Sequence, residues 1–93
     1  MSADTDAIMQ NAMRCGFGVI RTSHPIGHTG LREAWVKAVE FREGNDVLLY
    51  ASASAALMDK PIYPEKVTCL KDFDFHAGDT LEIQEWGVKM SWA

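Results

Sequence analysis

Residues 72–86 read D-F-D-F-H-A-G-D-T-L-E-I-Q-E-W, and this stretch decides the fold that we expect. Two runs that alternate between apolar and polar residues meet at Gly78-Asp79, a pattern typical of a turn between two strands. The stretch carries five carboxylates and contains neither Lys nor Arg. The sequence therefore predicts an antiparallel β-hairpin with one acidic face.

Side chains alternate between the two faces of a strand, so the hairpin assigns a face to each residue. We expect one face to be buried, and its members are Phe73, Phe75, Leu81 and Ile83. The acidic face, the turn and the end of the second strand supply the predicted contact residues, which are Asp72, Asp74, Asp79, Glu82 and Trp86. We expect them to bind the basic surface of a protein partner, because charge complementarity accelerates association. An ordinary solvated strand face, which resists edge-to-edge aggregation, is the alternative interpretation.

Upstream of this hairpin, the longest helical pattern covers residues 31–43. Most of its apolar residues lie on one side of a helical wheel, and Thr29 and Gly44 suit the two caps. A hairpin that turns at Gly44-Asn45 is the alternative for this segment. The remaining expected elements are a helix over 5–14, strands over 17–22 and 47–50, one or two helical turns over 52–59, and strands over 67–75, 80–86 and 88–92.

These elements predict a small single domain of the α+β class that covers residues 1–93. Two helices, one near the N-terminus and one over residues 31–43, would pack on an antiparallel sheet of about four strands that ends in a C-terminal hairpin or meander. An apolar fraction of 47% and a charged fraction of 24% are ordinary for such a chain. Because a chain of this length has little room for a deep cavity, a pocket could require a second subunit, and a homo-oligomer is one expectation.

Charge and composition narrow the class of function. The net charge is −4, and the nine Lys and Arg residues are scattered along the chain, which argues against nucleic-acid binding. No apolar run approaches the roughly 18 residues of a membrane span, and the first residues are acidic where a signal peptide is basic. We therefore expect a cytoplasmic protein that makes no membrane contact.

No sequence pattern identifies a cofactor, a metal site or a catalytic group. Cys15 and Cys69 are far apart and form no C-x-x-C motif, so neither a disulfide framework nor a redox site is indicated. His24 and His28 have the spacing of metal ligands on a helix, but a Pro and a Gly between them place them in a loop. This loop is a candidate site for a small ligand or an anion. We expect a non-catalytic protein without cofactor or metal.

Residues 75–86, which read F-H-A-G-D-T-L-E-I-Q-E-W, resemble a strand-turn-strand piece of the ASCH and PUA-like small β-barrel domains. Several of these domains are associated with RNA. The Gly-Lys-x-x-Glu-x-Arg type signature of ASCH domains is absent from the sequence. The resemblance implies a barrel-like domain that binds a small ligand or RNA through the loop of residues 24–30 and an aromatic wall.

Three functions are therefore open from the sequence. The first is non-catalytic protein binding, inhibitory or accessory in kind, through the acidic hairpin. The second is the binding of a small ligand or RNA by a barrel-like domain. The third is a structural role in a larger assembly, in which unpaired strand edges join the subunits.

Overall fold

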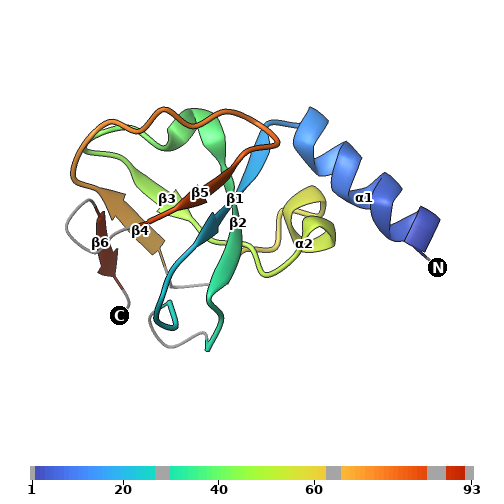
Figure 1. The fold of residues 1–93 in the computed structure, drawn as a ribbon, viewed down its shortest axis with the longest axis horizontal. Coiled ribbons are helices and arrows are strands. Elements are labelled where there is room, and N and C mark those ends of the chain that lie inside the picture. Colours follow the sequence, from blue (N-terminus) through green and yellow to red (C-terminus); the bar gives the residue numbers. More distant parts are fainter. Residues whose placement is uncertain (1, 27–29, 63–65, 84–87, 92–93) are drawn as a thin grey trace.

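Two three-stranded sheets face each other, and two helices cover one of them (Figure 1). The computed structural model describes residues 2–26, 30–62, 66–83 and 88–91. The elements in these ranges are α1 (Ser2–Arg14), β1 (Phe17–Arg21), β2 (Glu33–Lys37), the 3-10 helix η1 (Ala38–Glu40), β3 (Asp46–Leu48), α2 (Ala53–Leu57), β4 (Lys66–Cys69), β5 (Thr80–Glu82) and β6 (Val88–Ser91). The predicted α+β class and the small single domain are confirmed.

The first sheet, called sheet A, has the strand order β2-β1-β5, and the second, called sheet B, has the order β3-β4-β6. In sheet A, β1 pairs with β2 antiparallel and with β5 in parallel. Both pairs in sheet B are antiparallel. Trp35 and Tyr50 exchange backbone hydrogen bonds of 2.8 and 2.9 Å, so the two sheets are joined at one corner.

The core has two layers because β1 and β2 are buried on both faces. Ala34 and Val36 of β2 face sheet B, whereas Trp35, which lies between them, faces the helices. The layer between the sheets contains Ile20, Ile26, Ala34, Val36, Ala38, Phe41, Val47, Leu49, Val67, Cys69, Phe75, Ile83 and Val88. The layer between sheet A and the helices contains Ala12, Phe17, Trp35, Tyr50, Ala53 and Ala56.

The prediction of a helix over residues 31–43 is wrong. This segment forms β2, the short η1 and a turn, and β2 pairs along its whole length with β1. Ala34, Trp35 and Val36 are all buried, at 1%, 8% and 0% exposure, which a strand between two apolar layers allows and a one-sided surface helix does not. The second helix is α2, which lies where one or two helical turns were predicted.

The prediction of an antiparallel hairpin over residues 72–86 is also wrong, although the turn at Gly78-Asp79 forms. Residues 72–76 are not part of a strand, and β5 pairs in parallel with β1 instead. The connection between β4 and β5 crosses from sheet B to sheet A and inserts Phe75 into the core. There Phe75 lies against Gly18, where an added Cβ would be 2.6 Å from its ring. The expected single antiparallel sheet is therefore replaced by two sheets, one of them mixed.

Within the described residues, neither helix combines the length and the apolarity that a bilayer span requires.

Candidate functional site

The predicted acidic contact residues occupy two surfaces rather than one stripe. Asp72, Asp74 and Asp79 are exposed on the connection between β4 and β5, and we call them the acidic ridge. Glu82 lies on β5 and lines a groove on the outer face of sheet A. Trp86, the predicted aromatic anchor, lies outside the described residues.

The ridge follows the predicted alternation even though it is not a strand. Phe73 is half-buried and Phe75 is buried, whereas Asp72 and Asp74 are exposed. Both rings pack on Phe41, with ring centroids 5.1 and 5.5 Å apart. The two aromatic side chains therefore hold this segment against the core and leave its carboxylates in solvent.

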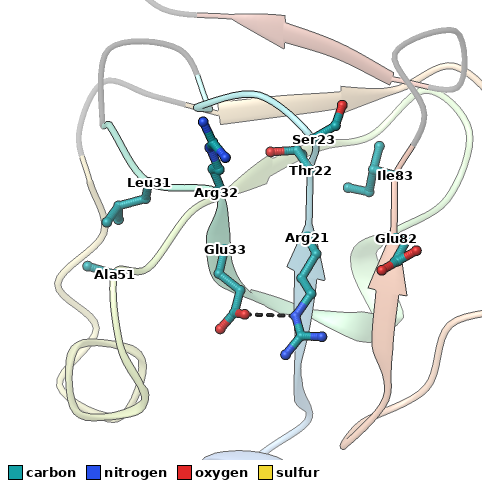
Figure 2. A pocket seen from close by; sticks show the side chains of 9 residues that line it. All are labelled: Arg21, Thr22, Ser23, Leu31, Arg32, Glu33, Ala51, Glu82 and Ile83. Atoms are coloured by element: carbon teal, nitrogen blue, oxygen red, sulfur yellow. Dashed lines mark hydrogen bonds and ion pairs between the residues drawn. The ribbon is translucent and has the colours of Figure 1, made fainter.

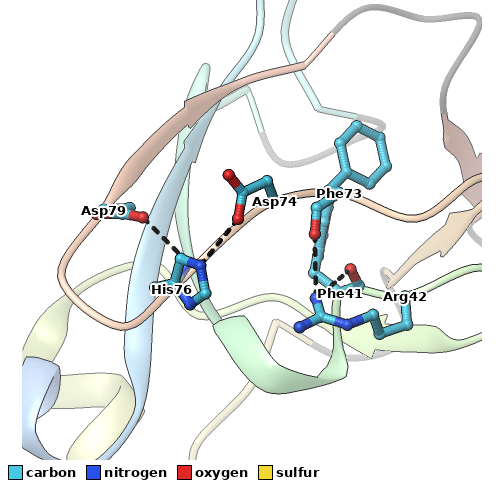
Figure 3. A network of polar contacts seen from close by, with 6 residues as sticks. All are labelled: Phe41, Arg42, Phe73, Asp74, His76 and Asp79. Atoms are coloured by element: carbon cyan, nitrogen blue, oxygen red, sulfur yellow. Dashed lines mark hydrogen bonds and ion pairs between the residues drawn. The ribbon is translucent and has the colours of Figure 1, made fainter.

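Hydrogen bonds attach the ridge to the turn that follows η1. The Asp72 carboxylate accepts a bond of 3.0 Å from the backbone N–H of Glu43. The Arg42 guanidinium donates to the carbonyls of Phe41 and Phe73, at 3.2 and 3.1 Å (Figure 3). These contacts fix the start of the ridge without neutralising its carboxylates through an ion pair.

The other end of the ridge is closed by a turn around His76. The backbone N–H of His76 donates to the Asp79 carboxylate at 3.1 Å, and the backbone N–H of Asp79 donates to the His76 carbonyl at 3.0 Å. The imidazole Nε2 lies 2.8 Å from an oxygen of Asp74 (Figure 3). The side chains of His76 and Asp74 are 70% and 96% exposed, so this pair lacks the enclosed environment of a catalytic dyad.

Few cations oppose the ridge. Among the described side chains, neither Asp72 nor Asp79 forms an ion pair with Lys, Arg or His. The Lys71 ammonium lies 5.1 Å from the centre of the Phe73 ring. In the described residues, the ridge therefore presents carboxylates to solvent that no Lys or Arg side chain neutralises in an ion pair.

Glu82 belongs to a row of charges across the outer face of sheet A. The strand register places Arg21 between Glu33 on β2 and Glu82 on β5. The Arg21 guanidinium pairs with Glu33 at 2.7 Å (Figure 2). Among the described residues Glu82 has no ion-pair partner, so the row carries one carboxylate that is not neutralised.

This charged row lies where two cavities meet. A cavity of about 540 Å³ lies on one side, lined by Arg21, Thr22, Ser23, Leu31, Arg32, Glu33, Ala51, Glu82 and Ile83 (Figure 2). A second cavity of about 390 Å³ lies between sheet A and the helices, and Ile8, Met9, Met13, Val19 and Trp35 give it an apolar wall. Both cavities are lined by Arg21, Glu33 and Ala51, and we call the continuous surface the sheet A groove.

The predicted loop site is only partly described. His24 is exposed, its carbonyl accepts a hydrogen bond from the Thr22 hydroxyl, and His28 lies outside the described residues. Thr22 and Leu31, which flank the loop, both line the sheet A groove. In the described part of the chain, no group of three His, Cys, Asp or Glu residues is placed to hold a metal ion.

Two buried titratable side chains have structural roles. Burial raises the pKa of Tyr50 to about 12, and the hydrogen bond of 2.8 Å that its hydroxyl donates to Asp59 acts in the same direction. Burial also raises the pKa of the Cys69 thiol to about 11, which keeps it protonated and unreactive.

Sequence reasoning missed the contribution of Arg21, Glu33 and Met13 to a site. They come from β1, β2 and α1, and only the register of sheet A and the packing of α1 bring them together. The apolar spacing that predicts a helix over residues 5–14 carries no signal for a groove.

No protein-family model matches the chain, and neither the comparison with curated proteins nor the comparison with solved structures found a match.

Proposed function

We propose that this protein is a non-catalytic binding domain that contacts the basic surface of a protein partner through its acidic ridge. The observation that supports the proposal best is the arrangement of three exposed carboxylates on a segment that two aromatic residues pack against the core. Backbone hydrogen bonds hold the Asp72 and Asp79 carboxylates, and the His76 ring contacts Asp74. Charges that are already ordered cost less to immobilise on binding, and a negative surface steers a positive partner during approach.

The ridge is built on an irregular segment of a rigid scaffold, which is the usual position of a recognition element. Its carboxylates also disfavour a phosphate backbone, because nucleic-acid binding depends on clustered Lys and Arg. For this reason we propose a protein partner rather than RNA.

The test is an association measurement on variants that change charge and keep shape. Asn keeps the oxygen that accepts the backbone hydrogen bonds at positions 72 and 79, so the variant D72N/D74N/D79N removes three charges with little structural change. After chemical cross-linking has identified the partner, we expect stopped-flow association at low salt to be about tenfold slower, with a weaker salt dependence.

A variant with the same loss of charge at other places is the control. D6N/E40Q/D46N removes three exposed carboxylates outside both the ridge and the sheet A groove, and we expect it to slow association by no more than about twofold. Equal slowing by both triple variants, or cross-links that avoid the ridge, would show that the contact surface lies elsewhere.

A second candidate function is the binding of a small ligand in the sheet A groove. Its support is the cavity of about 540 Å³ lined by Thr22, Ser23 and Leu31, a volume within the range of small-molecule sites. Saturable binding of a small amine without any peptide or protein would favour this candidate.

A further inference from the structure

The charges of the sheet A groove are unevenly distributed. Arg21 is engaged by Glu33 at 2.7 Å, which leaves Glu82 as the exposed carboxylate at the β5 end of the row. Arg32, the second cation of this cavity, lies on the β2 side of the groove, across from Glu82 (Figure 2). A positive group beside Glu82 would extend the row to alternating charges, so the β5 side of the groove is complementary to a cation.

The neighbouring cavity is suited to an apolar side chain. Met9 and Met13 of α1 and Trp35 of β2 line it, together with Val19. Methionine side chains are flexible and polarizable, so a wall that contains them adapts to apolar groups of different shapes. The cavity meets the charged row at Arg21 and Glu33, which line both spaces.

The groove continues into the acidic ridge. The Gly78 backbone lies beside α1, where an added Cβ would be 3.8 Å from the sulfur of Met13. Asp79 follows Gly78, and Thr80, the next residue, lines the apolar cavity. Asp79 just before β5 and Glu82 at its end are both exposed, so the negative surface of the ridge continues to the groove and an extended peptide can contact both carboxylates.

We propose that the sheet A groove binds an extended segment of a protein partner in which basic and apolar residues alternate, with a basic side chain at Glu82 and an apolar side chain between α1 and Trp35. This assignment rests on the proposed function, because the same partner would contact the ridge. The apolar anchor supplies affinity, and the basic residues determine the position of the segment on the surface.

The experiment is an NMR titration of the full chain with three synthetic peptides, acetyl-KLKLK-amide, acetyl-KGKGK-amide and acetyl-ELELE-amide. We expect the first to shift the methyl signals of Met9 and Met13 and the amide signal of Glu82. It should bind about tenfold more tightly than the second, which lacks the apolar anchor, and the third should not bind.

Two variants locate the contact and one serves as a control. E82Q should weaken binding of acetyl-KLKLK-amide about three- to tenfold, whereas D46N, which removes the same charge from sheet B, should leave it unchanged. Ser54 is exposed and lines the apolar cavity, so S54W should fill the cavity and abolish the methyl shifts without disturbing the core.

Several results would overturn the assignment. The first two are equal affinity of the protein for acetyl-KLKLK-amide and acetyl-KGKGK-amide, and NMR shifts confined to residues 72–79. The third is binding of n-hexylammonium alone as tightly as acetyl-KLKLK-amide. The fourth is NMR shifts that depend on protein concentration without any peptide, which would indicate a second copy of the chain in the groove. Shifts confined to the ridge would leave the proposed function standing. A partner cross-linked to the outer face of sheet B would instead contradict the proposed function while the peptide result stood.

Discussion

Tyr50 joins three parts of the molecule. Its backbone bridges to Trp35 in β2, its ring packs edge-on against Phe17 with centroids 5.4 Å apart, and its hydroxyl donates to Asp59. Asp59 has a φ of 53°, which a non-glycine residue adopts at some cost. The hydrogen bond from Tyr50 therefore joins two local backbone bonds, from Asp59 to Ala56 and from Lys60 to Ala55, in fixing the turn that follows α2.

The raised pKa of Tyr50 predicts a loss of stability at high pH. Its folded-state pKa of about 12 lies above the ordinary value of 10.0, so folding favours the protonated phenol. The contribution is fully present below pH 10 and is lost as the pH rises toward 12. We expect the free energy of unfolding, measured with urea, to fall over this range, and Y50F to fall less steeply.

Cys69 provides the control for this measurement, because its raised pKa acts in an overlapping pH range. The variant C69A should keep the part of the decline that belongs to Tyr50. At neutral pH, Y50F should be less stable by about 1 kcal/mol through loss of the hydrogen bond. Identical pH profiles of the wild type and Y50F would contradict the assigned role of the phenol.

Gly18 is required by close packing rather than by its backbone conformation. A Cβ at this position would lie 2.6 and 2.9 Å from two ring atoms of Phe75 and 3.0 Å from the Asp79 carbonyl oxygen. We expect G18A to lower the free energy of unfolding by about 1–3 kcal/mol, as overpacking in a core does. Urea denaturation measures the loss.

A double variant distinguishes this clash from a general effect of alanine in the strand. Leucine at position 75 has no ring atoms to collide with the added methyl group, so G18A should cost less in the F75L background than in the wild type. Additive losses in G18A/F75L would show that the two positions do not interact. G44A is a useful contrast, since Gly44 has a φ of 86° and no atom near its Cβ position.

At the scale of elements, β2 shows how one segment supports two periodicities. Its apolar residues fall on one side of a helical wheel, yet they also alternate between two buried layers. Val36, which the helical pattern leaves outside the apolar side, is fully buried in the strand. The strand is the better solution because β1 offers a partner for all five of its residues.

The observed strand β2 and the helix that the sequence predicts for the same residues imply opposite effects of one surface substitution. Lys37 is exposed at the end of β2, opposite Phe17. Because threonine is favoured in strands by up to about 1 kcal/mol and disfavoured in helices by roughly 0.5 kcal/mol, we expect K37T to raise the free energy of unfolding. A decrease in urea denaturation, with E40Q as an exposed control outside β2, would argue against the strand.

Residues 72–82 show a second limit of prediction from local sequence patterns, also at the scale of elements. Alternation correctly predicted that Phe73 and Phe75 turn inward while Asp72 and Asp74 stay exposed. It predicted the wrong partner for the following strand, because a turn followed by β5 is compatible with either direction of pairing. The crossing of residues 70–79 between the sheets places β5 beside β1 and thereby moves Glu82 from the ridge to the groove.

At the scale of the molecule, the two sheets share one apolar layer and are joined by the bridge between Trp35 and Tyr50. This connection predicts that they unfold together. Val67 on the central strand of sheet B is fully buried, and V67A should cost about 2 kcal/mol through the cavity it creates. In a domain that unfolds cooperatively, the same loss of stability also applies to sheet A.

Hydrogen exchange measures this coupling. In V67A, amide protection at Ile20 and Val36 of sheet A should fall by about 30-fold, the same factor as at Val47 in sheet B. Unchanged protection in sheet A would mean that the sheets open separately. The exposed substitution D46N in sheet B should leave exchange in sheet A almost unchanged.

The sequence by itself determined the features that depend on neighbours along the chain. These are the amphipathic α1, the turn at Gly78-Asp79 and the inward and outward faces of residues 72–75, because each follows from a periodicity or a turn preference within a few residues. The tertiary structure alone decided that residues 33–37 form a strand, that β5 pairs with β1, and that Glu82 and Met13 line one groove. Those outcomes depend on which distant segment supplies a pairing edge and a second apolar layer, and local periodicity carries no information about either.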